Sequence, residues 1–266
     1  GRDVRAWCLA RARLLGFDTD MTFRALILAA SLAASPLLAQ TDKTAVPENA
    51  DFVASNVIAI LYHELGHALI DILLLPVFGQ EEDAADTLSA LMMDAHFEDD
   101  AAQAILADTA WSFLMDDEAR AADGVEVAFW DVHGPDLQRL YNTVCLAYGA
   151  SPETRAGLIE EFELPEDRAE TCEEEFEVAA ESWGAALEEV EGGDGPLLEL
   201  LEGESSFLRD LASAEINALN QLYSLDPPIT VRVEECGEAN AYYNGASTAI
   251  TLCEELVGHL NAQVGE

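Results

Sequence analysis

The chain has 266 residues, of which 52 are Asp or Glu and 12 are Lys or Arg, so its formal net charge at pH 7 is −40. Such a charge repels phosphate backbones and anionic lipid, which argues against nucleic acid as a partner and against any membrane contact beyond a cleaved signal. Half of the residues are hydrophobic, enough to bury the core of one domain. Because apolar residues recur mostly every three or four positions, we expect a mainly α fold with a small β-hairpin or sheet, an α+β protein.

The beginning of the chain predicts export. Residues 1–20 lack an initiator Met and are expected to be a non-native upstream segment. From Met21, a short basic start, an apolar run and a final small residue are typical of a signal peptide over residues 21–39. Leu37, three positions before the cut, leaves an uncleaved anchor as the alternative. Residues 40–266 are then a single periplasmic or secreted domain with a charge of −42, because the segment before them holds five Arg and three Asp.

The most informative stretch is the His-Glu-Leu-Gly-His motif that begins at His63, within a run that predicts a helix between Asp51 as N-cap and Pro76. Histidines four apart lie on one face of a helix, so His63 and His67 can bind the same ion. Glu64 can then take a proton from water at a zinc ion, as the general base of a peptidase. The alternative is a buried helix with two hydrogen-bonded histidines.

A zinc ion held by two histidines needs a third protein ligand and an open position for water. The next helical segment opens with Glu-Glu-Asp-Ala-Ala-Asp, in which Glu82 and Asp86 share one face. We expect Glu82 to be the third ligand and Asp86 to accept a hydrogen bond from the free N–H of His63. Glu81, Asp83 and Asp86 remain rival ligands, and an acidic first turn stabilised by the helix dipole would need no metal.

Downstream, periodicity predicts four more helices, and alternation predicts a small β region. The helices are expected at Asp99–Met115, Gly134–Tyr148, Glu166–Glu189 and Leu208–Leu222. The glycine-rich residues 191–196 are the clearest break, either a turn inside the domain or a linker. A β-hairpin region is expected over residues 229–253: residues 229–233 read as a strand, and residues 242–252 as a hairpin that turns at or shortly after Asn244-Gly245.

The cysteines predict two disulfides. Once Cys8 is removed with the leader, four remain, and an even number in an exported chain favours disulfides over free thiols. Three pairings are possible, and we expect the neighbours in sequence to pair, Cys145 with Cys172 and Cys236 with Cys253. Neither pair has the spacing of a zinc ribbon or a redox motif.

A peptidase of this type also needs a donor for the oxyanion that forms at the attacked carbonyl. His133, in a loop before a predicted helix, is the first candidate, and Tyr242 and Tyr243 are the others. The alternative for His133 is a structural role with a hydrogen bond to Asp136.

The HELGHALID run, together with the LPVFGQEEDAAD segment that follows it, resembles a bacterial family of inferred metallopeptidases whose domain has no assigned function. Similar features follow at Asp131-Val132-His133, Gln138 to Asn142, Cys145, Gly149, Arg168-Ala169, Cys172, and Cys236 to Cys253. The resemblance covers most of the chain from about residue 50. It implies a zinc-dependent, gluzincin-like peptidase whose third ligand is a glutamate, and it implies no known substrate. In relatives with a similar hairpin pattern we would expect the hairpin before the HELGH helix, whereas here it comes last.

These observations predict an exported zinc metallopeptidase with one zinc per chain, acting on a peptide or protein substrate. A non-catalytic metal- or peptide-binding envelope protein on a zincin-like scaffold is the alternative, and a helical protein without metal is a third class. The presence of Glu64 disfavours the second class, because a structural zinc site has no use for a base. The other histidines, His96 and His259, show no partner pattern and are expected at the surface.

Overall fold

The computed structural model describes residues 42–264, so the predicted upstream segment and signal peptide lie outside the described residues. Residues from Ala45 onward form one compact unit with an α+β fold, as predicted. Its helices are α2 (Ala50–Ile72), α3 (Glu81–His96), α4 (Asp99–Ala122), α5 (Asp136–Ala150), α6 (Gly157–Glu161), α7 (Glu166–Ala169), α8 (Cys172–Glu188), α9 (Phe207–Leu219) and α10 (Glu255–Gln263). Its strands are β1 (Leu198–Leu200), β2 (Ile229–Glu234), β3 (Ala241–Asn244) and β4 (Ala249–Cys253).

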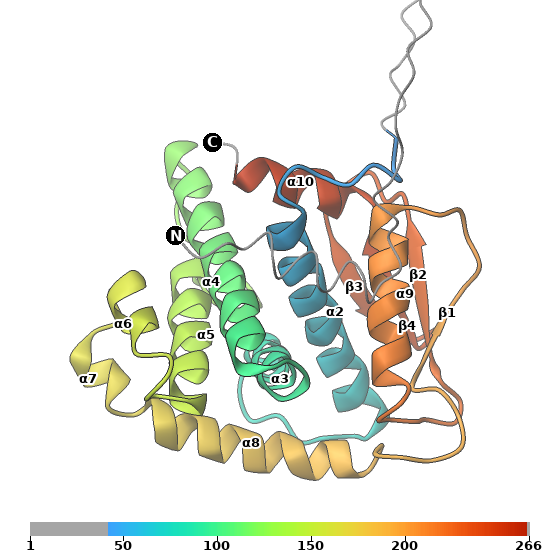
Figure 1. Ribbon diagram of the computed structural model, residues 1–266, viewed down its shortest axis with the longest axis horizontal. Helices are drawn as coiled ribbons and strands as arrows, with labels where there is room; N and C mark the ends of the chain where they lie inside the picture. Colours follow the sequence, from blue (N-terminus) through green and yellow to red (C-terminus); the bar gives the residue numbers. More distant parts are fainter. Residues whose placement is uncertain (1–41, 265–266) are drawn as a thin grey trace, which may run out of the picture. The chain divides into compact units, whose positions relative to one another are not determined.

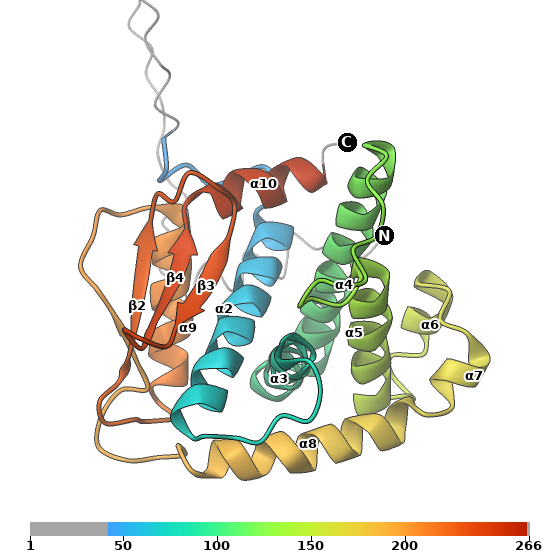
Figure 2. The same ribbon diagram turned by 180° about the vertical axis from the view of Figure 1, so that it is seen from behind.

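The helix that carries the HELGH motif runs through the middle of this unit. Figures 1 and 2 show α2 with α4 and α5 on one side and the sheet with α9 on the other. The N-cap of α2 is Asn49, two residues before the predicted Asp51, and the helix ends at Ile72, before Pro76. Leu74 then adopts a positive φ of 53°, which turns the chain out of the helix. Because α2 is covered on both sides, its histidines are held by a rigid core element.

Length and composition would also allow α2 to cross a membrane, and among the described residues it is the one helix of this kind. Its most apolar window is 78% buried inside the protein. A core helix passes the same test, so this property alone is weak evidence for a membrane span.

Helices α2 and α3 approach each other most closely at Gly66, inside the motif. A Cβ atom on Gly66 would lie 2.9 Å from the Cα atom and 3.1 Å from the Cβ atom of Ala85. Any side chain at position 66 would therefore push α3 away. The glycine allows the first turn of α3 to lie directly against the two histidines.

The sheet has the strand order β1-β2-β4-β3, with β1, β2 and β4 parallel and β3 antiparallel at the edge. The predicted strand and hairpin correspond to β2 and to β3–β4, with the turn at residues 245–248. Strand β1 and helices α6 and α10 were not predicted, because three to nine residues carry too little periodicity. The edge strand β3 packs against α2, which brings the C-terminal hairpin to the HELGH helix.

Two of the predicted helices differ from the structure by more than three residues or by a break. The predicted helix Glu166–Glu189 is interrupted between α7 and α8, and α4 continues seven residues beyond the predicted end. Helix α8 begins at Cys172, whose disulfide holds it to α5. The glycine-rich break is a turn inside the compact unit, because the backbone N–H of Gly192 donates to the carbonyl of Leu222.

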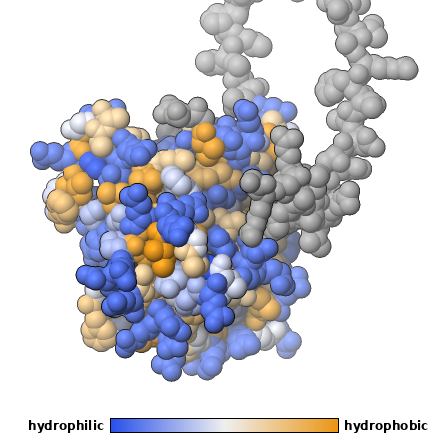
Figure 3. All heavy atoms as spheres, turned by 60° about the vertical axis from the view of Figure 1, so that its left-hand side comes forward, coloured by the Kyte–Doolittle hydropathy of each residue, from blue (hydrophilic) through white to orange (hydrophobic). Residues whose placement is uncertain are grey.

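Both disulfides have the predicted pairing. Cys145 in α5 is bonded to Cys172 at the start of α8, and Cys236 in the loop after β2 is bonded to Cys253 at the end of β4. The paired cysteines are 27 and 17 residues apart, so each bond joins two different elements of the fold. The surface in Figure 3 is mostly hydrophilic with small hydrophobic groups, in keeping with the acidic composition.

Candidate metal centre

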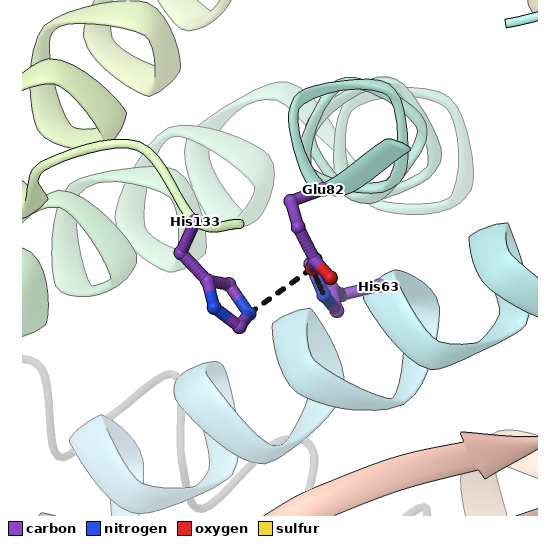
Figure 4. A group of neighbouring side chains, drawn as sticks. All are labelled: His63, Glu82 and His133. Atoms are coloured by element: carbon purple, nitrogen blue, oxygen red, sulfur yellow. Dashed lines mark ion pairs between the residues drawn. The ribbon is translucent and has the colours of Figure 1, made fainter. Parts of the chain in front are cut away.

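Three imidazoles and one carboxylate meet between α2, α3 and the loop before α5. The Oε2 atom of Glu82 lies 3.2 Å from Nε2 of His63, 3.1 Å from Nε2 of His67 and 3.0 Å from Nε2 of His133. The two Nε2 atoms of the HELGH histidines are 3.2 Å apart. Figure 4 shows the rings of His133 and His63 both at the carboxylate of Glu82. Among the described residues, His63, Glu82 and His133 form a group whose donor atoms could hold one metal ion.

The donor set fits a metal, because these atoms are the ones that a transition metal prefers. Neutral imidazole nitrogens together with one carboxylate oxygen are typical ligands of zinc. Two ligands of a tetrahedral zinc with bonds of about 2.0–2.1 Å lie about 3.3–3.4 Å apart. The separations among His63, His67 and Glu82 are 3.1–3.2 Å, close to this value. The ligand role of these residues stays a prediction.

Each HELGH histidine has a carboxylate on its other ring nitrogen. Nδ1 of His63 lies 2.7 Å from Oδ1 of Asp86, the contact expected from the spacing. Nδ1 of His67 lies 2.8 Å from Oε1 of Glu81. A carboxylate accepts here, so Nδ1 carries the hydrogen and Nε2 faces the centre. Glu81, considered above as a rival ligand, thus contacts the far side of His67, and Asp83 is not among the side chains that meet at the centre.

Sequence reasoning missed Arg139, which holds Asp86 in place. Its Nε donates to Oδ2 of Asp86 at 2.7 Å and its Nη2 to Oδ1 at 2.8 Å, and the guanidinium lies 4.3 Å from the ring centre of Phe113. Burial raises the pKa of Asp86, but the hydrogen bonds and charges of Arg139 and His63 outweigh burial and hold this pKa well below its usual range. The residue was noted only as part of the family resemblance, and nothing local in the sequence shows that α5 brings it to α3.

The charge distribution at the centre favours a cation. Hydrogen bonds from His133, His63 and His67 hold the pKa of Glu82 far below its usual range. Burial lowers the pKa of His63, but Asp86 and Glu82 outweigh it and raise the pKa to about 9. A metal that binds here would therefore compete with a proton on His63.

Glu64 is buried and points into the same cavity as the histidines. Burial raises its pKa, while His63 and His67 act in the opposite direction. The backbone N–H of Tyr243 in β3 donates to its carboxylate. The edge strand therefore orients the predicted base, a contact that the sequence did not predict.

The two candidate tyrosines belong to the edge strand β3, at the cavity that contains the histidines. The cavity has a volume of about 880 Å³ and is lined by residues of α2, α3, α4, α5, α10, β3 and the loops before α3, α5 and β3. Tyr242 and Tyr243 both line it, and the hydroxyl of Tyr243 donates to Asp71 at 2.9 Å. The hydroxyl of Tyr243 is thus engaged with α2 in this structure, and the role of either tyrosine as oxyanion donor stays a prediction.

Two expectations about histidines are wrong. His133 does not pair with Asp136; its partners are Glu82 and Asp131, because the loop turns its ring toward α3 before α5 begins. His96 is half-buried rather than at the surface, and its Nε2 lies 2.9 Å from the hydroxyl of Tyr223. His259 is exposed, as expected, 3.6 Å from a carboxylate oxygen of Asp116.

Cys236, Cys253 and Glu255 also have donor atoms close together. The two cysteines form a disulfide, so their sulfur atoms are not thiolates and this group is not a metal site.

Comparison with protein families places the chain. Residues 30–187 and 200–266 match the family described as "Putative metallopeptidase", DUF4344, and the chain belongs to this family. Searches of curated proteins and of solved structures found no match. Membership suggests a metal and a peptidase activity, and the cluster at His63 is where the described residues offer ligands for that metal.

Proposed function

We propose that this protein is an exported zinc-dependent peptidase, in which His63, His67 and Glu82 hold the metal and Glu64 is the general base. The observation that carries the proposal is the meeting of the histidine Nε2 atoms and the Glu82 carboxylate at one point of a cavity that also contains a buried glutamate. Membership of a metallopeptidase family supports it.

Zinc is the metal that this donor set suits best. Two histidines and one glutamate leave a fourth position for water, which is the arrangement of catalytic zinc sites. When bound, the metal supplies Lewis-acid chemistry: it polarises the carbonyl of the substrate and lowers the pKa of water.

Glu64 would move the protons of the reaction. It takes a proton from the attacking water and returns it to the leaving amine. Burial raises its pKa toward the working range of a general base, and the N–H of Tyr243 donates to its carboxylate and restricts its orientation. A base held in one orientation loses less entropy when the substrate arrives.

His133 would stabilise the negative charge that develops on the carbonyl oxygen. Hydrogen bonding to Glu82 raises its pKa although burial lowers it, so the ring keeps a proton that it can donate. Its place beside Glu82, on an exposed loop, lets it reach a substrate in the cavity.

The substrate would be an extended peptide lying along β3. Because the N–H of Cys253 donates to the carbonyl of Asn240, the alternate residues Ala241 and Tyr243 direct their backbone groups away from β4. Their N–H groups donate to Oδ1 of Asn240 and to Glu64, so a peptide that binds here by strand addition would use the carbonyl groups of this edge. The acidic surface disfavours nucleic acid, and the two disulfides are compatible with an extracellular or periplasmic protein.

One observation favours the non-catalytic alternative. With His133 Nε2 only 3.0 Å from Glu82, this histidine could fill the fourth position at the metal. A closed site with four protein ligands is structural rather than catalytic.

The variant Glu64→Gln separates the two functions. For a peptidase we expect it to keep one zinc per chain and to lose about 10²- to 10⁴-fold in the hydrolysis of a peptide library. The control Glu188→Gln, an exposed glutamate of α8, should change neither quantity. A wild-type protein that holds zinc but cleaves nothing would support the structural site, and a protein that folds without binding zinc would reject both.

A further inference from the structure

The exposed aromatic side chains of the described residues lie on segments that line the cavity or adjoin its lining residues. Among the described residues, the exposed large aromatics are Phe78, Phe129, Trp130 and Tyr242. Tyr242 lines the cavity itself; Phe78 lies two residues before the lining residue Gln80, and Phe129 and Trp130 directly precede the lining residue Asp131. The side chain of Gln80 donates to the carbonyl of Asp131, so the two loops that carry Phe78, Phe129 and Trp130 lie next to each other.

Phe129 and Trp130 occupy the two central positions of a tight turn. The N–H of Asp131 donates to the carbonyl of Ala128 at 2.9 Å, and the two aromatic side chains between them are 83% and 86% exposed. Central turn positions normally hold Gly, Pro, Asn or Asp. Large apolar side chains at such positions gain nothing from burial in the fold, so the fold does not explain them.

This turn is fixed to the metal centre. The side chain of Gln80 donates to the carbonyl of Asp131 at 3.3 Å, which joins the loop before α3 to the loop before α5. The N–H of His133 donates to Oδ1 of Asp131 at 3.0 Å, and His133 contacts Glu82. The aromatic residues are therefore presented by a hydrogen-bonded loop, and a preorganised surface loses little entropy on binding.

We propose that Phe78, Phe129 and Trp130, here called the aromatic rim, bind apolar side chains of an extended polypeptide next to the bond that is cleaved. This inference rests on the proposed function and names the class of substrate: unfolded or extended segments with aromatic or aliphatic side chains and few acidic ones. We infer a polypeptide as the bound partner because the loops of the aromatic rim adjoin the cavity and because the cavity lining is acidic. Exposed aromatic residues are the side chains that dominate binding energy at protein surfaces, and the net charge of −40 repels an acidic peptide.

The test is a binding measurement that does not depend on hydrolysis. The zinc-loaded Glu64→Gln protein is titrated, by fluorescence anisotropy, into labelled peptides of Gly, Ser and Lys with a central Phe-Phe or a central Ser-Ser. We expect about tenfold tighter binding of the Phe-Phe peptide. The additional changes Phe129→Ser and Trp130→Ser should reduce this preference to about twofold or less. Replacing Lys by Glu in the peptide should weaken binding, less so at high salt.

The matched control replaces two exposed leucines outside the cavity lining, Leu201→Ser and Leu222→Ser, and should keep the preference. Thermal unfolding verifies that both double variants fold. A preference that survives in the rim variant, or falls equally in the control, overturns the inference. So does rim-dependent binding to neutral phosphatidylcholine vesicles, or rim-dependent dimerisation in sedimentation, without a peptide preference.

The two proposals fail separately. If the wild type holds zinc and cleaves peptides but the rim variant keeps the preference, only the aromatic rim is rejected. If the protein neither holds zinc nor cleaves peptides, and the zinc-free chain still prefers the Phe-Phe peptide through the rim, only the peptidase is rejected.

Discussion

Two histidine-containing clusters lie on neighbouring positions of α2, and they differ in how donors and acceptors are arranged. Around His63, the Nε2 atoms of His63, His67 and His133 each lie within 3.2 Å of one carboxylate oxygen of Glu82. Around Tyr62, the contacts form a chain: the tyrosine hydroxyl donates to Glu215, and His96 lies between the hydroxyls of Tyr62 and Tyr223.

The difference teaches how a cation site can be told from a structural network. In the Tyr62 cluster each acceptor faces a hydroxyl donor, so the network is satisfied by itself. In the His63 cluster the acceptors face one another, and only a proton or a metal ion relieves their repulsion. The raised pKa of His63, about 9, reports the same need for a positive charge. Variants in and around the two clusters test this distinction.

The largest effect is expected from removing one ligand of the first cluster. Glu82→Gln keeps the size of the side chain but replaces an anionic ligand, so zinc affinity should fall by more than the roughly 10- to 100-fold typical of outer-shell changes. The matched change in the other cluster, Tyr62→Phe, should leave zinc content intact and lower the free energy of unfolding by about 1–3 kcal/mol. Elemental mass spectrometry and denaturant unfolding measure the two quantities. Loss of zinc in Tyr62→Phe would show that the clusters act as one.

A smaller effect on zinc is expected from Arg139, which contacts the first cluster through Asp86. Arg139→Met should lower zinc affinity about 10- to 100-fold, because Asp86 loses the pair of hydrogen bonds that aims it at His63. If Arg139 acts through Asp86, the double variant with Asp86→Asn should be little weaker than Asp86→Asn alone. Competition with a chelator measures the affinities.

Arg155→Met is the control for Arg139, because Arg155 is buried and pairs with Asp94 and Asp99 away from the metal centre. Its loss should destabilise the fold by about 3–5 kcal/mol without changing the zinc affinity of the folded protein. If Arg139→Met and Asp86→Asn lower the zinc affinity additively, Arg139 does not act through Asp86.

Gly66 tests whether the first cluster depends on the close approach of α2 and α3. Helix propensity alone predicts that Gly66→Ala stabilises by about 1 kcal/mol. The contact with Ala85 opposes this, and overpacking costs about 1–3 kcal/mol, so we expect a net loss of stability together with weaker zinc binding. At Gly184 in α8 nothing lies within 4 Å of the new Cβ, so Gly184→Ala should stabilise and leave zinc unchanged. Equal stabilisation by both variants would disprove the steric argument.

The smallest effect concerns Asp108, a buried carboxylate outside both clusters. Burial raises its pKa from 3.8 to about 6, although the hydroxyl of Ser55 donates to it at 2.7 Å. The pKa of Asp108 is higher in the folded than in the unfolded protein. The contribution of the protonated Asp108 to folding stability is therefore complete below about pH 4 and is lost as the pH rises through about 6. Asp108→Asn removes this loss and should stabilise by about 1–2 kcal/mol at pH 7 and by almost nothing at pH 4. Denaturant unfolding curves at pH 4 and pH 7 measure the free energy of unfolding of both proteins. If Asp108→Asn raises it equally at both pH values, ionisation of Asp108 is not the cause.

Local spacing was enough to predict part of the fold and of the candidate site. The α+β class, the HELGH helix, the strand at residues 229–233 and both disulfide pairings are confirmed. Residues four apart on one helix share a face whatever the rest of the fold does, which is why His63 with His67, and Glu82 with Asp86, could be grouped in advance. Their function as ligands and base stays a prediction.

What the sequence determined by itself is therefore the chemistry within each segment: two imidazoles and a glutamate on one helix, acids in the first turn of the next, and four cysteines after the predicted leader. Only the tertiary structure decided which segments meet. It brought His133 to Glu82, Arg139 to Asp86 and the N–H of Tyr243 to Glu64. The physical reason is that periodicity shows only which side chains share one face of a segment. Contacts between residues 50 to 180 positions apart depend on how all these faces pack together. Close approaches of two elements, such as that of α2 and α3 at Gly66, determine which side chains come into contact.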